Sequence, residues 1–356
     1  MFEYTTPKKN KILIYGHQYL DEIKFFLKEK NFTTLNFQKK NIYIICKMLR
    51  QCEYNRLDYL VLYIKHVEPK IFITAADNDF NIYKLKEKFP KIIFIVIQNG
   101  RRGGPVDIFN REFKNCKKKY HIDHFFVFGE ALKKEYSKYV KAKYYCSGSI
   151  KNNYLNKVKN LCLKKKIVFI SQYRENISEN RIIYSNEIKL LSTLSKFAKK
   201  KGLWLDILPA YDPNNYLFLK EKEHLEKYID IARDKIILKK KFPYTYKILE
   251  RYFIIFGLES TLLYESLGRN LKICSFKRIK NFKGYSFNWP YKVASKGFFY
   301  TDTVNEEELE KLYNNMKKIT QPKWFKLIKS YQKNLICHDY MNNKIKKIIN
   351  NITSQV

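Results

Sequence analysis

The chain has 356 residues, of which 45% are hydrophobic and 16% aromatic, so it can bury substantial cores and is not intrinsically disordered. Its 70 Lys and Arg outnumber its 34 Asp and Glu, and the formal charge of +36 favours anionic partners such as nucleic acid, anionic lipid or phosphorylated substrates. Because the lysines are spread along the chain, we attribute most of this excess to the base composition of an AT-rich genome.

The cysteines and the apolar segments indicate in which cellular compartment the protein lies. The seven cysteines are odd in number and form no CxxC pair, which argues against a disulfide framework and a zinc site and indicates a reducing compartment. The N-terminal stretch has no apolar core of signal-peptide length, and no window approaches about 18 uncharged apolar residues. We expect a cytoplasmic protein, with peripheral contact to the inner membrane face as an option.

Short apolar runs alternate with helical patterns from the N-terminus onward. In the first half, the runs that predict buried parallel strands cover residues 11–16, 70–77, 91–100, 124–129 and 142–148. Helical spacing covers residues 17–30, most of 41–66, and 81–90, where Pro90 ends the helix.

The alternation restarts near residue 167. The strands predicted in the second half cover residues 167–172, 203–210, 235–241, 252–257 and 271–276. An amphipathic helix covers residues 186–202, and one or two helices close the chain after residue 321. This pattern predicts an α/β protein with two successive doubly wound domains, which we place at residues 1–155 and 156–356.

Polar residues follow two successive strands of the first half, at the edge where open α/β sheets bind ligands. Asp77 is the candidate catalytic residue, because a carboxylate there can act as a base on an acceptor hydroxyl or as the nucleophile of a double displacement. Asp79 is the fallback, and Asn78 is a candidate substrate-binding residue. The alternative is that this Asp-Asn-Asp run only caps the helix that begins at Asn81.

The second of these strands ends in Gln98, Asn99 and Arg101, which are candidate substrate-binding residues. Amide side chains bind sugar hydroxyls, and Arg101 can pair with the carboxylate of an acidic sugar or with phosphate. The alternative is a plain Asn-Gly turn. It explains Gln98 least well, because an unpaired amide at the end of a buried strand is costly. We expect Arg102 on the surface.

In the second half, the segment YFIIFGLESTLLYESLGRN covers residues 252–270. A strand leads into a turn with Glu259, and Ser260 and Thr261 stand where a helix begins. A helix N-terminus offers N–H groups and a positive dipole end to phosphate, and Glu265 could accept hydrogen bonds from ribose hydroxyls. Ser and Thr are also preferred N-caps without any ligand, so a purely structural cap is the alternative.

The segment FISQYR places Ser171, Gln172 and Arg174 just beyond the strand that opens the second domain. Arg174 could meet a donor phosphate there. A solvated loop arginine is the alternative.

GLESTLLYESLGRNLKICSF resembles the nucleotide-binding strand and helix of GT-B glycosyltransferases, where a similar Ser-Thr turn holds the donor phosphate. CSGSIKNN is similar to the Gly-Ser segment that ends the N-terminal domain of that fold. The resemblance implies two Rossmann-like domains facing a cleft, an N-terminal acceptor domain, no metal or other cofactor, and closing helices that often cross back to the first domain. The nucleotide-binding residues it implies are Gly148, Ser149, Ser171, Gln172, Arg174, Glu259, Ser260, Thr261 and Glu265.

FITAADND and IFIVIQNGRR resemble, more narrowly, a family of bacterial surface-carbohydrate biosynthesis proteins related to retaining β-Kdo transferases that use CMP-Kdo. This resemblance implies that Asp77 is the nucleophile and that the donor is a CMP-activated acidic sugar, Kdo or a related one. The chain departs from such relatives at Phe242 and Pro243, where they can carry His-Pro, so the nucleotide stays open. The resemblance covers residues 65–275.

The sequence lacks the residues expected of a metal site, an ATPase or a dinucleotide oxidoreductase. His121 and His124 have only Asp123 as a nearby acid, so they complete no metal shell, although His121 is an outside candidate for acid–base work. Neither the Walker A pattern GxxxxGK[ST] nor GxGxxG occurs, which argues against ATPases and dinucleotide oxidoreductases.

We therefore predict a GT-B glycosyltransferase of capsule or lipopolysaccharide biosynthesis that transfers an acidic sugar from a CMP-linked donor to a glycan or lipid-linked glycan. Exposed lysines, with Trp324 and Phe325, would hold the protein on an anionic membrane. A transferase using a UDP-sugar, a GDP-sugar or a CDP-polyol is one alternative, and a basic nucleic-acid-binding protein is another. A nucleic-acid-binding protein requires a clustered basic face and a motif that recognises bases. The sequence shows neither, so we expect no specific nucleic-acid partner.

Overall fold

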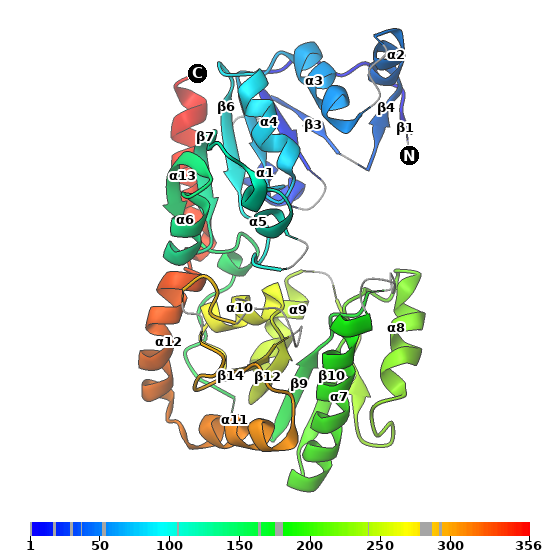
Figure 1. Ribbon diagram of the computed structural model, residues 1–356, viewed down its shortest axis with the longest axis vertical. Helices are drawn as coiled ribbons and strands as arrows, with labels where there is room; N and C mark the ends of the chain where they lie inside the picture. The colour runs from blue at the N-terminus through cyan, green and yellow to red at the C-terminus, as the bar shows by residue number, and fades with distance from the viewer. Residues whose placement is uncertain are drawn as a thin grey trace. The chain divides into compact units, whose positions relative to one another are not determined.

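The computed structural model describes residues 2–16, 19–28, 31–36, 38–51, 55–104, 107–162, 165–174, 181–240, 242–277, 287–291 and 294–356, with only the backbone of 181–185 (Figure 1). Two compact units divide the chain. The first unit comprises Met1–Tyr154 and Asp339–Val356, and the second comprises Leu155–His338. The predicted boundary lies within one residue of the first division. The last 18 residues, which the prediction assigned to the second domain, belong to the first unit.

The first unit alternates strands and helices. Its strands are β1 (Phe2–Glu3), β2 (Ile12–Tyr15), β3 (Phe32–Leu35), β4 (Lys40–Asn41), β5 (Ile71–Thr74), β6 (Ile93–Ile97), β7 (Tyr120–Val127) and β8 (Val140–Cys146). Its α-helices are α1 (Leu20–Phe26), α2 (Ile42–Arg50), α3 (Arg56–Val67), α4 (Phe80–Lys88), α5 (Ile108–Arg111), α6 (Glu130–Tyr136) and α13 (Asn343–Ser354). Short 3₁₀ turns cover Phe113–Asn115, Asn152–Tyr154 and Tyr340–Asn342.

Six strands of the first unit form one parallel sheet in the order β3-β2-β5-β6-β7-β8. Runs of β-branched and aromatic residues suit strands covered on both faces. Alternate residues face opposite sides, and one side packs against α1 and α13. The spacing of Ile345, Ile349 and Ile352 gives α13 an apolar stripe, which lies in the core with Ile14 and Ile73. In Figure 1 the red helix α13 runs alongside β6 and β7. Burial of this stripe explains why the last helix belongs to the first unit.

The second unit contains β9 (Lys166–Ile170), β10 (Trp204–Leu208), β11 (Lys235–Ile236), β12 (Ile254–Leu258), β13 (Ile273–Phe276) and β14 (Tyr300–Thr301). Its helices are α7 (Arg181–Lys201), α8 (Leu217–Glu226), α9 (Tyr244–Ile248), a 3₁₀ turn at Leu249–Arg251, α10 (Thr261–Gly268), α11 (Glu306–Lys318) and α12 (Gln321–Leu335). The sheet is parallel, in the order β11-β10-β9-β12-β13-β14. Numbered from β9, this is the 3-2-1-4-5-6 order of dinucleotide-binding folds.

The predicted strands of both units form, with a few differences at the sheet edges. Of the predicted strand 235–241, Lys235–Ile236 forms a strand, 237–240 do not, and 241 lies outside the described residues. The edge strand Phe32–Leu35 was not predicted, because its sequence FTTL is short and half polar. Most of its residues are only half-buried in the structure. Across the described residues, no helix has both the length and the apolar character needed to cross a membrane.

Candidate functional site

The central edge of the second sheet brings together two of the predicted segments. The strand order reverses between β9 and β12, where Ile170 pairs with Gly257. Ser171 and Gln172 follow β9, and Glu259 and Ser260 follow β12. In doubly wound sheets ligands bind in the crevice at such a reversal. The structure therefore places the two predicted nucleotide-binding segments side by side at the expected edge.

Ser260 is the N-cap of α10. Its backbone is extended and its hydroxyl accepts a hydrogen bond from the N–H of Leu263 at 3.1 Å, so this serine is a helix cap, whether or not it also binds a ligand. Thr261 is the first residue of the helix, and Glu259 before the cap has φ +32°. A capped N-terminus still directs its dipole at a ligand. Phosphate binding by this turn stays a prediction.

Glu265 lies inside α10 and is 2% exposed. Its carboxylate accepts a hydrogen bond from the Tyr246 hydroxyl at 2.8 Å, which ties α9 to α10. The ribose contact predicted for Glu265 would have to reach this buried group, so that role also stays a prediction.

Glu221 holds the loops after β9 and β10 in place, and the sequence analysis did not identify it. This fully buried carboxylate on α8 accepts hydrogen bonds from the Ser171 hydroxyl at 2.7 Å and from the N–H groups of Ala210 and Tyr211 at 2.7 and 2.9 Å. It thereby fixes the loops after β9 and β10 to each other. An acid at a core position of an amphipathic helix, between Phe218 and Leu225, was the signal that could have found it.

Gln172 follows Ser171 in the loop after β9, and its backbone N–H and its side-chain oxygen differ in their hydrogen bonding. It is 9% exposed, and its N–H donates to Glu187 Oε1 at 2.5 Å. Within the described part of the chain, its side-chain Oε1 is buried without a hydrogen-bond partner. A buried acceptor of this kind is costly unless a ligand or water donates to it.

Arg174 is exposed where the β9 loop leaves the described residues. Its guanidinium donates to the Tyr173 carbonyl at 2.8 Å and lies 6.0 Å from the ring of Tyr211. Its predicted phosphate contact stays a prediction.

In the first unit, Asp77 is fully buried. Its carboxylate accepts from the N–H of Asn99 at 2.9 Å, from the Tyr136 hydroxyl at 2.6 Å, and from Nε of Arg102 at 2.8 Å, and it also accepts from Nη2 of Arg102. Four donors match the four lone-pair sites of a carboxylate. The geometry favours a structural role for Asp77, and the catalytic role stays a prediction.

Arg102 is not on the surface, so that prediction is wrong. It is 6% exposed because Asp77 neutralises it across β5 and β6, and Nη2 also donates to Asn99 Oδ1 at 2.6 Å. Burial lowers the pKa of Arg102, but the charge and hydrogen bonds of Asp77 outweigh it and raise that pKa above the ordinary value. Burial and the Asp77 charge raise the pKa of Tyr136 well above its ordinary value. The network fixes the loop that follows β6.

The predicted substrate-binding residues divide into buried and accessible ones. Gln98 is 1% exposed, receives the N–H of Phe128 at 2.8 Å and donates to the Gly100 carbonyl at 2.7 Å, so its amide is used by the fold. Asn99 donates to Asn78 Oδ1 at 3.4 Å, which brings these two amides together. Arg101 is half-buried beside them.

The Gly148–Ser149 segment follows β8 in the first unit. Gly148 has φ +72°, and Ser149 is buried, with its carbonyl accepting the N–H of Asn153 at 3.0 Å. This turn leads into the 3₁₀ turn Asn152–Tyr154. Its nucleotide-binding role stays a prediction.

Two other groups are not brought into a site. His121 is exposed, and His124 lies 3.0 Å from the Tyr145 hydroxyl. Among the described residues, no three His, Cys, Asp or Glu side chains are grouped to hold a metal ion. Trp324 is fully buried and donates to the Asn270 carbonyl at 2.9 Å, so the prediction that it contacts a membrane is wrong. It fills the core instead, and Phe325 is half-buried.

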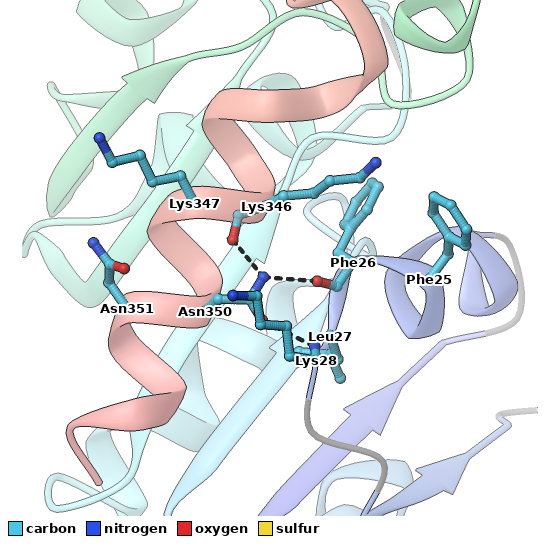
Figure 2. Close-up of a pocket in the computed structure, with 8 residues that line it drawn as sticks. All are labelled: Phe25, Phe26, Leu27, Lys28, Lys346, Lys347, Asn350 and Asn351. Atoms are coloured by element: carbon cyan, nitrogen blue, oxygen red, sulfur yellow. Dashed lines mark hydrogen bonds between the residues drawn. The ribbon is translucent and has the colours of Figure 1, made fainter.

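A pocket of the first unit lies between the end of α1 and α13 (Figure 2). Asn350 bridges the two helices by donating to the carbonyls of Phe26 and Lys346 at 3.0 and 2.8 Å. Because α1 starts at the carboxyl end of β2 and runs back along the sheet, this pocket lies toward the amino ends of the strands. It is therefore remote from the edge that carries Asp77.

Comparison with known proteins agrees with this architecture. The UDP-GlcNAc 2-epimerase of Methanocaldococcus jannaschii in complex with UDP-GlcNAc and UDP is 13% identical, with a TM-score of 0.58 over 95% of this chain and 98% of that chain. The Neisseria meningitidis UDP-GlcNAc 2-epimerase bound to UDP-GlcNAc is 14% identical, with a TM-score of 0.53 over 97% and 100%. The wall teichoic acid polymerase TagF is 12% identical, with a TM-score of 0.51 over 98% and 89%. These similarities show the predicted two-domain GT-B fold.

No curated protein matches the chain in sequence. A family model described as "putative O-antigen biosynthesis protein" matches residues 95–353, which is well over half of the chain. The chain therefore belongs to this family of O-antigen biosynthesis proteins.

Proposed function

We propose that the protein is a glycosyltransferase of surface-polysaccharide assembly, which binds a nucleotide-sugar donor at the reversal point of the second sheet. One observation carries the proposal: the loop after β9, held by Glu221, lies beside the capped N-terminus of α10 in a sheet of dinucleotide-binding order. Membership of an O-antigen biosynthesis family supports the pathway.

The donor has two candidates. The resemblance of FITAADND and IFIVIQNGRR to relatives of β-Kdo transferases implies a CMP-linked acidic sugar such as Kdo, which we propose first. Two proteins of the same fold carry UDP-GlcNAc, which makes a UDP-sugar the alternative. The first unit would bind the acceptor, a glycan or lipid-linked glycan, through Asn78, Asn99 and Arg101. Since Trp324 is buried, any membrane contact would use other residues.

Thermal stabilisation by CMP, CDP, UDP, GDP and ATP tests the donor site. A ligand at 100 times its Kd stabilises the native state by about 2.7 kcal/mol. Ser260→Ala removes a cap worth about 1 kcal/mol whether or not a ligand binds, so a matched control is needed. Asn305→Ala provides it, because Asn305 caps α11 of the same unit by accepting the N–H of Glu308 at 2.8 Å.

We expect both variants to lose similar stability without ligand, and only Ser260→Ala to lose the nucleotide-induced shift. A shift with CMP alone supports the CMP-sugar donor, and a shift with UDP alone supports the alternative. If no nucleotide stabilises the wild-type chain, the proposed function is wrong.

A further inference from the structure

Three side chains from different elements meet at the carboxyl edge of the first sheet. Tyr15 ends β2, Arg56 begins α3, and Asp79 is the N-cap of α4. Nη2 of the Arg56 guanidinium donates to the Tyr15 hydroxyl at 2.6 Å and to Asp79 Oδ2 at 2.8 Å. The Tyr15 hydroxyl itself donates to Asp79 Oδ2 at 3.2 Å. The three groups form a closed triangle.

This triangle lies at the reversal point of its sheet. The chain passes from β2 to β3 on one side and then to β5 on the other. Tyr15 is the last residue of β2, and Asp79 lies beyond the carboxyl end of β5. The N-terminus of α3 lies at the same edge, because this helix returns the chain to the start of β5. Ligands of doubly wound sheets bind at such positions.

The position and the Asp79 ion pair of Arg56 add little to local stability. Asn55 caps α3 by accepting the N–H of Asp58 at 3.0 Å, and a cation at the next position opposes the helix dipole. The Arg56 side chain is 54% exposed, and an ion pair of this exposure contributes about 0–1 kcal/mol. A charged side chain that opposes a local sequence rule is a candidate for a functional role.

Of the two charged groups, the Arg56 guanidinium is the one accessible to solvent. The Asp79 side chain is 13% exposed, and its carboxylate also accepts the N–H of Asn81 at 3.2 Å. Burial, followed by the Asp79 charge, raises the pKa of Tyr15 to about 12, so its hydroxyl stays a donor near neutral pH. The negative charge is thus mostly enclosed, while the positive charge reaches solvent.

We propose that Arg56, held in place by Tyr15 and Asp79, binds an oxyanion group of the acceptor, either a carboxylate or a phosphate. This inference rests on the proposed function only in assigning the acceptor to the first unit. A planar guanidinium binds such groups through paired hydrogen bonds, and orienting it beforehand lowers the entropic cost of binding. Tyr15 and Asp79 are positioning residues.

The test measures calorimetric binding of inorganic pyrophosphate, glucuronic acid and uncharged glucose to the full chain. Arg56→Gln is compared with Arg111→Gln, which removes the same charge from an arginine of the same unit whose side chain is 63% exposed and pairs with Glu112 at 3.5 Å. We expect Arg56→Gln to weaken anion binding about tenfold or more, and Arg111→Gln to leave it within about twofold. Tyr15→Phe, which keeps the ring, should weaken it less than Arg56→Gln.

The outcomes separate the possible sources and the two proposals. Binding of pyrophosphate alone points to a phosphate-bearing acceptor, and binding of glucuronic acid alone points to an acidic glycan. Equal losses in both arginine variants reflect the general attraction of a +36 chain and overturn the inference. So does the absence of anion binding to the wild type. Nucleotide stabilisation should survive Arg56→Gln, so failure of the donor site would show separately.

Discussion

Replacing Asp77 by Asn separates a structural carboxylate from a catalytic one. The carboxylate is fully buried and accepts from Asn99, Tyr136 and two nitrogens of Arg102. An amide of the same shape keeps one oxygen and turns the other acceptor into a donor, so two donors lose their partner and Arg102 loses its counter-charge. Removing one member of a buried ion pair costs about 3–5 kcal/mol.

Urea unfolding can measure this loss in the first unit alone. The three tryptophans, Trp204, Trp289 and Trp324, all belong to the second unit, so their fluorescence follows that unit. Far-ultraviolet circular dichroism follows both units, whose transitions are fitted separately because a chain of two units need not unfold in one step. We expect Asp77→Asn to shift the first-unit transition seen by circular dichroism and to leave the fluorescence transition in place.

Glu87→Gln is the matched control. Glu87 pairs with Lys118 at 2.7 Å in the same unit, with side chains 38% and 61% exposed, and such a pair contributes about 0–1 kcal/mol. If Asp77→Asn costs no more than this control while sugar transfer is lost, the structural reasoning is refuted and Asp77 is catalytic.

Three further predictions concern the core, the donor loop and pH. Ile349→Ala should cost about 2–5 kcal/mol in the first-unit transition, because this residue of α13 is fully buried there; a shift in tryptophan fluorescence would instead assign α13 to the second unit. Glu221→Gln should cost about 1–3 kcal/mol in the fluorescence transition and weaken nucleotide stabilisation, because the amide keeps only one of the two acceptor oxygens that hold Ser171, Ala210 and Tyr211; intact nucleotide binding would remove the loop from the donor site. Burial lowers the pKa of His124 and His224, so the unfolded chain binds more protons and stability should fall as the pH drops from about 7.5 to 5.5. If the urea midpoint still changes with pH by the same amount after both histidines are replaced by Gln, the assignment to these histidines is wrong.

Local sequence patterns predicted most of the secondary structure and the fold. Uninterrupted apolar runs predicted the central strands of both sheets, and these strands form because each is covered on both faces. Ser260 was also placed correctly, since an N-cap needs only its own helix turn. The edge strand Phe32–Leu35 was missed, because a half-buried strand with two threonines carries a weak apolar signal.

The sequence by itself determined the alternation of strands and helices, the helix caps and the Ser-Thr turn, because those depend on neighbours within one or two turns. Only the tertiary structure decided which charges are buried. It brought Arg102 to Asp77 across 25 residues and Ser171 to Glu221 across 50. It also assembled the triangle of Tyr15, Arg56 and Asp79 at the reversal of the first sheet. A charged side chain is buried or exposed according to its partner, and here the partners come from separate strands and helices.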